Sequence, residues 1–225
     1  MDEAKSLDHT LTLALVLRHS SIFEAMIGNH SAAQRLASAL RTICVERDVH
    51  QWRHLGELMY LWASLGAGER VGLDGIFDAF ERQRQTGFLL NMPFNLMLVA
   101  DACFAAGDPE RSDGLLRQAL ALAETTGEVW VRPELLRRRA CRAVLCAAVS
   151  KEDAERWLSE ALGEARRQGD RVAELRINYD LARLWIERED CQAARDLLAP
   201  LCDWLDGRAD LPDLVKAKAL LDQAA

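Results

Sequence analysis

The feature that most constrains the fold is a helix ending that recurs at a nearly constant interval. Gly87, Gly127, Gly169 and Gly207 each follow an apparent helix. Glycine readily adopts the left-handed backbone conformation in which many helices stop. A fixed period of roughly 40 residues is typical of proteins built from stacked helical repeats.

Two further series of residues follow the same period inside apolar helical patterns. Small residues dominate both series, which comprise Ser20, Tyr60, Ala100, Ala140 and Ala182, and then Ala32, Gly72, Ser112, Ala154 and Ala194. After the second series come large aliphatic residues (Leu36, Ile76, Leu116, Leu158, Leu198), and three residues later Ala39, Ala79, Ala119, Ala161 and Leu201. Spacings of four and three place side chains on one helix face. Each period is therefore predicted to be an antiparallel hairpin of two helices, A and B, in close contact.

The turn within a hairpin is clearest in the stretch "AAGDPERS". Gly107 suits a helix C-terminal cap, Asp108 suits an N-cap, and Pro109 suits the first helical turn. Ser150 and Asp153 form the pattern of a capping box at the start of another B helix.

These patterns predict an all-α fold, a right-handed α-solenoid of about five antiparallel helix pairs with a C-terminal capping helix. One hairpin cannot bury its own apolar face, so the hairpins should stack into one domain over 1–225. The predicted repeats span 7–48, 49–88, 89–128, 129–169 and 170–208, and the capping helix spans 211–225. The predicted helices lie near 7–28, 31–47, 50–66, 69–86, 91–106, 109–126, 130–148, 151–168, 171–188, 190–206 and 213–224.

Composition and charge narrow the class of protein. Half of the 225 residues are hydrophobic and 28% are charged, which is typical of a globular chain. The net charge of −7 argues against direct binding of nucleic acid. The start "MDEAKSLDHT" has no apolar run, and no stretch reaches membrane-spanning length, so we expect a cytoplasmic protein that does not bind membranes. None of the six cysteines forms a C-x-x-C pair, so we expect reduced thiols.

The second half of the chain resembles a known bacterial family. The segments "TGEVWVRPELLRRRA", "EALGEARRQG", "AELRINYDLARLW", "CQAARDLLAPLCDWL" and "LPDLVKAKALLD" follow one another as in the C-terminal tetratricopeptide-like region of large signalling proteins. In those proteins a class III adenylate/guanylate cyclase domain or a winged-helix DNA-binding domain comes first, followed by a STAND-type predicted ATPase. The first half, including "RQTGFLLNMPFNLMLVADACFAAGDPE", is similar to the same array more loosely.

The resemblance implies a non-catalytic binding or scaffold module. It would act as the sensory or protein-interaction arm of a cyclase-type or transcription-regulating ATPase. This sequence has no G-x-x-x-x-G-K-[ST] phosphate loop, so the ATPase is not part of it. The expected partner is a protein or peptide in a concave groove, or an anionic small molecule. A small-molecule effector sensor is the alternative function, and an excised domain and a free-standing array are both consistent with the sequence. Its oligomeric state is left open.

In tetratricopeptide folds helix A lines the concave groove, and the resemblance carries four groove positions of each repeat onto this sequence. The predicted partner-binding residues are His54, Glu57, Phe94, Met97, Asp101, Glu134, Arg137, Arg176, Tyr179 and Arg183; Leu61, Ser64, Phe104, Cys141, Val144 and Ile186 occupy the remaining positions. This floor changes from acidic through aromatic to basic, which suits a partner with an acidic end. The alternative is that Glu134, Arg137 and Arg176 form a structural ion-pair network between neighbouring A helices.

Other chemistry finds less support in the sequence. His50, His54 and Glu57 are spaced to lie near one another on a helix, but a third firm ligand and an H-E-x-x-H pattern are missing, so no metal or cofactor is expected. The arginines of "RPELLRRRACR" point in different directions around a helix and cannot all serve one site. No G-x-S-x-G motif occurs, so we do not expect an enzyme, and a hydrolase with a cryptic site is the remote alternative.

Overall fold

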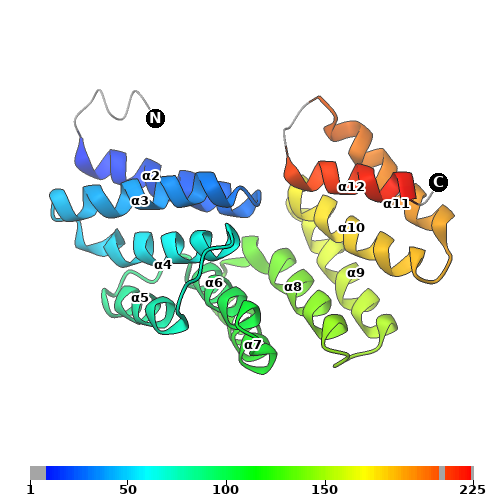
Figure 1. Cartoon of the computed structure of the whole chain (residues 1–225), viewed down its shortest axis with the longest axis horizontal. Helices are drawn as coiled ribbons and strands as arrows, with labels where there is room; N and C mark the ends of the chain where they lie inside the picture. The colour runs from blue at the N-terminus through cyan, green and yellow to red at the C-terminus, as the bar shows by residue number, and fades with distance from the viewer. Residues whose placement is uncertain (1–8, 208–210, 224–225) are drawn as a thin grey trace. The chain divides into compact units, whose positions relative to one another are not determined.

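The fold is all-α, as predicted, in a computed structural model that describes residues 9–207 and 211–223. Within these residues no strand occurs. Short connections join consecutive helices from α2 to α11 (Figure 1). The helices are α2 (Thr10–Met26), α3 (His30–Glu46), α4 (His50–Gly66), α5 (Leu73–Gln85), α6 (Met92–Ala105), α7 (Pro109–Thr126), α8 (Arg132–Leu145), α9 (Lys151–Gln168), α10 (Arg171–Ile186), α11 (Cys191–Leu205) and α12 (Pro212–Gln223). A 3₁₀ turn, η1 (Val129–Val131), precedes α8.

The predicted helix limits agree with these bounds to within four residues where they can be compared. The largest difference is at α5, which starts at Leu73 instead of residue 69, because Gly72 is an extended N-cap. α8 ends at Leu145 instead of residue 148, and Ala147 follows it with a φ of 51°. Predicted residues 7 and 8 of the first repeat, 208 of the fifth, and 224 and 225 of the capping helix lie outside the described residues.

Residues with positive φ follow the helices at the predicted period. Gly87, Gly127, Gly169 and Gly207 have φ values of 69–76° at the ends of B helices, which confirms the predicted stops. The ends of A helices show the same feature at Gly28, Gly68 and Gly107. Where this series lacks a glycine, Asp48, Ala147 and Glu189 adopt φ values of 57°, 51° and 65°. The period therefore marks the end of every helix in the five pairs.

The predicted N-caps are also confirmed. The Asp108 carboxylate accepts a hydrogen bond from the Arg111 backbone N–H at 3.0 Å. The Ser150 Oγ accepts one from the Asp153 backbone N–H at 3.1 Å. These bonds satisfy N–H groups that a helix start leaves without a partner, and so they fix where α7 and α9 begin.

The predicted packing register holds in the later repeats and shifts by one residue in the first. Ala100, Ala140 and Ala182 are at most 1% exposed, whereas Ser20 and Tyr60 are only half-buried. In α3 the residues predicted to pack were Leu36 and Ala39, but Leu36 is half-buried and Ala39 is exposed. The fully buried residues of α3 are Ala33, Ala37 and Leu40. The prediction was wrong there because the first interval between B helices, from Asp48 to Gly87, is shorter by one position than the next, from Gly87 to Gly127.

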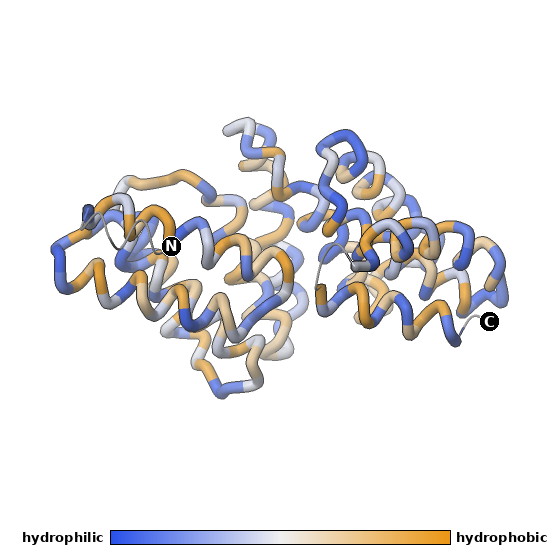
Figure 2. Tube along the Cα trace, turned by 90° about the horizontal axis from the view of Figure 1, so that it is seen from above, coloured by the Kyte–Doolittle hydropathy of each residue, from blue (hydrophilic) through white to orange (hydrophobic). Residues whose placement is uncertain are grey.

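The chain contacts group into two compact units, Met1–Ala119 and Leu120–Ala225, which we describe separately; a single domain over 1–225 stays a prediction. In the first unit α2, α3 and Trp52 of α4 share an apolar core, and α6 is buried on nearly all sides. In the second unit α8, α9 and α10 form the core around Leu158 and Ile177. Figure 2 shows the hydrophobic and hydrophilic residues that alternate along most helices.

Candidate functional site

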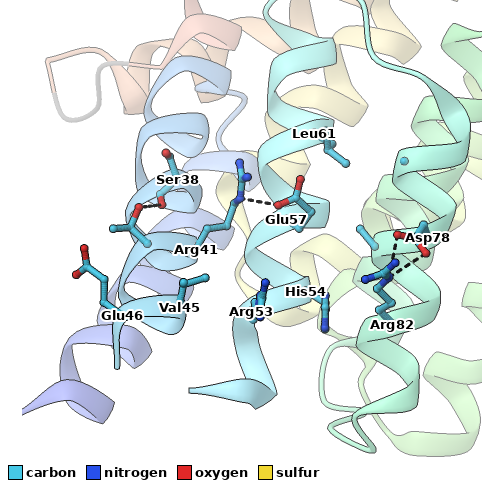
Figure 3. A pocket seen from close by; sticks show the side chains of 13 residues that line it. Ser38, Arg41, Val45, Glu46, Arg53, His54, Glu57, Leu61, Asp78 and Arg82 are labelled. Carbon is cyan, nitrogen blue, oxygen red and sulfur yellow. Dashed lines mark hydrogen bonds and ion pairs between the residues drawn. The ribbon is translucent and has the colours of Figure 1, made fainter. Parts of the chain in front are cut away.

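A cleft of about 660 Å³ lies over helix α4 in the first unit (Figure 3). Its floor is formed by α4, and its walls are α3 and α5. The α4 residues in it are Arg53, His54, Glu57 and Leu61; α3 adds Ser38, Arg41, Thr42, Val45 and Glu46, and α5 adds Gly75, Asp78, Ala79 and Arg82. Three arginines and three carboxylates are among these residues, so their charges balance.

Ion pairs organise two sides of this α3–α4–α5 cleft. The Arg41 Nε lies 2.6 Å from the Glu57 carboxylate and joins α3 to α4, and the Arg41 guanidinium stacks over the Tyr60 ring at 4.5 Å. On α5, the Arg82 Nε donates to the Asp78 carboxylate at 2.9 Å. Because these side chains are about one-third to three-fifths exposed, water screens both pairs and each contributes little to stability. They can exchange their partners for a bound polar group at low cost.

The neutral form of His54 is favoured within the cleft. Its partial burial disfavours the imidazolium, and the positive charges of Arg53 and Arg82 act in the same direction, so the pKa of His54 is lowered from its ordinary value. A neutral imidazole has one ring nitrogen that donates and one that accepts a hydrogen bond. The cleft therefore offers both kinds of polar group, together with the apolar Leu61 and Val45.

The structure brings together the residues predicted in the second repeat, but in a different kind of groove. His54, Glu57 and Leu61 line the cleft, whereas Ser64 is buried and accepts a hydrogen bond from Gln34 Nε2 at 2.8 Å. The predicted groove ran along neighbouring A helices. The observed cleft has one A helix as its floor and two B helices as its walls. The prediction of a groove between A helices therefore named the wrong neighbours for the exposed face of α4.

The predicted site residues of the third repeat do not lie on an open surface. Phe94 and Met97 are 0% and 1% exposed, so their prediction as groove residues is corrected. The reason is that α6 is apolar on nearly all its faces and therefore lies in the core. Asp101 is half-buried and accepts a hydrogen bond from Trp62 Nε1 at 2.9 Å, which joins α6 to α4.

In the second unit, Glu134 is the centre of a buried ion-pair network. Arg137 donates two hydrogen bonds to this carboxylate, at 2.7 and 2.9 Å, and Arg138 Nη2 lies 3.1 Å from it. Arg176 on the neighbouring A helix α10 approaches Glu134 at 3.7 Å. Glu134 is 1% exposed, so its charge depends on these three guanidinium groups. This arrangement is the structural ion-pair network that was the alternative to a partner-binding site.

Two acidic residues that were not predicted complete the network. Asp180 on α10 accepts a hydrogen bond from Arg137 Nη1 at 2.6 Å, and Asp213 on α12 accepts one from Arg176 Nε at 2.6 Å. Neither lies at one of the four groove positions carried over from the family. The one sequence signal for Asp180 was its place one repeat beyond the arginine cluster, on the next A helix.

The network shifts the protonation of its own members. Burial opposes ionisation of Glu134, but the charges of Arg137, Arg138 and Arg176 outweigh it and hold the pKa of that carboxyl well below its usual range. Burial likewise opposes the charge on Arg137, but Glu134 and Asp180 raise the pKa of its guanidinium. Burial, and then the nearby Asp180, raise the pKa of the Cys141 thiol, so this cysteine is protonated at neutral pH. The Glu134–Arg137 pair is therefore charged at neutral pH and stays so well below it.

The remaining predicted residues of the second unit lie outside this network. Tyr179 is half-buried, and Arg183 is exposed two helical turns beyond Arg176 on α10. The two arginines closest to the predicted anion site, Arg137 and Arg176, already contact carboxylates. An acidic partner would have to compete with these intramolecular pairs.

Over residues 9–207 and 211–223, no three His, Cys, Asp or Glu side chains are grouped so that they could hold a metal ion. Over the same residues no helix is both long and apolar enough to cross a membrane. No known protein-family profile matches the sequence. No curated protein matches it either.

Proposed function

We propose that the chain is a non-catalytic binding module, in which helix hairpins stack as a right-handed α-solenoid and hold a peptide or protein segment. The observation that supports this proposal is the α3–α4–α5 cleft. It combines apolar side chains with hydrogen-bond donors and acceptors on three helices, and its ion pairs are exposed enough to rearrange. A peptide main chain offers the matching groups for such a surface.

A small-molecule effector is the second candidate ligand. The cleft volume of about 660 Å³ lies within the range of small-molecule sites. Such sites are mostly apolar, however, and this cleft contains six charged side chains. The balance of charge therefore favours a polar ligand with groups of both signs, which a peptide provides.

From the resemblance described above, we also propose that the module serves a cytoplasmic bacterial signalling regulator of the cyclase or transcription-factor type. Capture of the ligand would change the activity of the output domain by binding its active and inactive states unequally. A neighbouring coding sequence for a cyclase, a winged-helix protein or a STAND-type ATPase is expected, and unrelated neighbours would count against this role.

The cleft can be tested with a variant that fills it from α5. A Cβ added at Gly75 meets only Leu61 Cδ1, at an ordinary contact distance of 3.7 Å, so Gly75→Trp should fold. Gly163→Trp on α9 is the matched control, because a Cβ there meets only the end of the Arg167 side chain. Peptides selected from a random phage-display library against the full chain would be titrated against both variants.

We expect Gly75→Trp to weaken binding of the selected peptides by about tenfold or more, roughly 1.4 kcal/mol, and Gly163→Trp to leave it unchanged. Equal binding by the two variants would place the peptides elsewhere and overturn the cleft as the binding site. Melting curves of both variants would show that neither has lost its fold.

A further inference from the structure

A second hollow in the first unit occupies the equivalent place one repeat earlier. It has a volume of about 880 Å³ and lies between α2 and α3, the helices of the first hairpin. The positive-φ residues that end the helices relate the two hairpins: Gly28 corresponds to Gly68, and Asp48 corresponds to Gly87. When the hairpins are aligned on these two pairs, the floor of this α2–α3 groove corresponds to the α4 and α5 sides of the α3–α4–α5 cleft.

The equivalent positions differ in chemistry. Leu13 and Leu17 on α2 correspond to the charged Arg53 and Glu57 on α4. On the B helices, Ala39 and Ile43 of α3 correspond to Asp78 and Arg82 of α5. Four charged positions of the cleft are thus apolar in the α2–α3 groove. Leu17 is 5% exposed and belongs to the core of the first unit, and Leu13 and Ile43 pack partly against that core, so Ala39 and the remaining surface of Leu13 and Ile43 face water. Apolar surface of this kind is stabilised when it is covered.

The second hairpin shows what covers such a groove. There α3 packs alongside α4 and forms the third wall with Ser38, Arg41 and Val45. The α2–α3 groove is lined by residues of α2 and α3, with no third helix of the described residues along it. Among the described residues, its position therefore continues by one repeat an interface that already exists in the same chain.

Other apolar side chains of α2 are exposed as well. Leu15 and Phe23 on α2 are 42% and 61% exposed. Their equivalents on α4, Leu55 and Ala63, are 1% and 0% exposed, because the preceding hairpin covers that face of α4. α2 thus exposes apolar side chains at positions that the neighbouring hairpin covers on α4.

We propose that the α2–α3 groove binds an amphipathic α-helix of a partner protein, which lies along the first hairpin as α3 lies along the second. Its apolar stripe, at helical spacings of three and four, packs on Leu13, Ala39 and Ile43. The groove margin contains both signs of charge, with Glu24 and Glu46 beside Arg35, so the partner helix has a mixed polar face instead of a strongly charged one. This is recognition of a helix in a groove, a mode distinct from capture of a peptide in the cleft.

The test uses the full chain and a hydrocarbon-stapled amphipathic peptide of four to five helical turns, with leucines on one helical face and equal numbers of Lys and Glu on the other. A scrambled peptide of the same composition and staple is the control. Ala39→Asp places in the groove the residue that the equivalent position of α5 already has, and Ala39 is exposed, so the fold should tolerate it. Leu145→Asp introduces the same charge at an exposed apolar residue in the second unit and is the matched control.

We expect fluorescence anisotropy to show binding of the amphipathic peptide and not of the scrambled one. Ala39→Asp should weaken that binding by tenfold or more, while Leu145→Asp leaves it unchanged. Equal binding of both peptides, no binding, or binding that survives Ala39→Asp would overturn the proposal. Sedimentation of the chain alone supplies a further outcome: self-association that Ala39→Asp abolishes would assign the groove to a second copy and overturn a partner helix.

Discussion

The two units place different chemistry at the same positions of the repeat. In the first unit, Phe94 and Met97 of α6 are buried among apolar neighbours. In the second unit the equivalent residues of α8 are Glu134 and Arg137, which are held by ion pairs to α10. The helix hairpin thus accepts either an apolar or a paired ionic layer at these positions. The following predictions test how far that equivalence extends, from the largest expected effect to the smallest.

The largest expected difference is between removing the buried Glu134 carboxylate and removing the partly exposed Glu57 carboxylate. Glu134→Ala leaves three arginines without their shared partner in a buried site, and we expect a loss of roughly 3–5 kcal/mol in the free energy of unfolding. Glu57→Ala in the first unit breaks the one-third-exposed pair with Arg41 and should cost about 0–1 kcal/mol. Urea denaturation at neutral pH measures both, and similar losses would mean that the buried network is no more important than a surface pair.

Acid should weaken the ionic layer through the same residue. The pKa of Glu134 is depressed in the folded state, so its contribution is complete above its unfolded value of about 4.3 and declines as the pH falls toward the folded value. We expect this group to contribute a loss of about 1.4 kcal/mol per pH unit in that window. Melting curves from pH 6 to pH 2.5 should fall more steeply for the native chain than for Glu134→Gln. Parallel curves would contradict the assignment.

Two helical glycines should respond in opposite directions to a single methyl group. A Cβ at Gly66 on α4 would overlap the imidazole of His30, which packs against Trp62 at 4.8 Å, so Gly66→Ala should cost about 1–3 kcal/mol. A Cβ at Gly163 on α9 meets only the end of the Arg167 side chain, and Gly163→Ala should stabilise by about 0.5–1 kcal/mol. Thermal melting of both variants gives the sign, and a stable Gly66→Ala would show that His30 is free to move.

The smallest effect is expected at the helix ends. Ala147 adopts a φ of 51° where the first three hairpins have glycine, and the left-handed conformation costs an alanine about 1–2 kcal/mol. Replacing Ala147 with glycine removes this cost, but part of the gain is offset because glycine makes the unfolded chain more flexible. Ala147→Gly should therefore stabilise the fold by about 0.5–1 kcal/mol. The reverse change, Gly107→Ala, should destabilise by a similar amount. If both variants lose stability, the repeat equivalence of these two turns is wrong.

Helix positions were predictable from the sequence because local chemistry determines them. Asp108 and Ser150 cap helices with their own side chains, and Gly169 ends one by its own backbone freedom. The register of α3 was not predictable in the same way. Two adjacent stripes of that helix are apolar, one facing the core with Ala37 and the other facing the groove with Ala39. Periodicity alone cannot tell which stripe is buried.

The candidate sites depended on contacts between hairpins, and these were only partly accessible from sequence. Glu134 and Arg137 are three residues apart on one helix, so their pairing followed from spacing. Asp180 and Asp213 lie far along the chain from the arginines that they contact, and no local pattern selects them from the other carboxylates. Arg176 was predicted to bind a partner, but it is 9% exposed and paired with Asp213, so its removal should also destabilise the fold.

Helix α3 is a partition between two hollows. Ser38, Thr42 and Glu46 line both the α3–α4–α5 cleft and the α2–α3 groove. A ligand in one hollow that fixes the rotamers of these three residues changes the free energy of ligand binding in the other hollow. Thermodynamic reciprocity requires the effect to be equal in both directions. If both proposed ligands bind, this one helix is where their affinities become coupled, without any movement of one hairpin relative to the next.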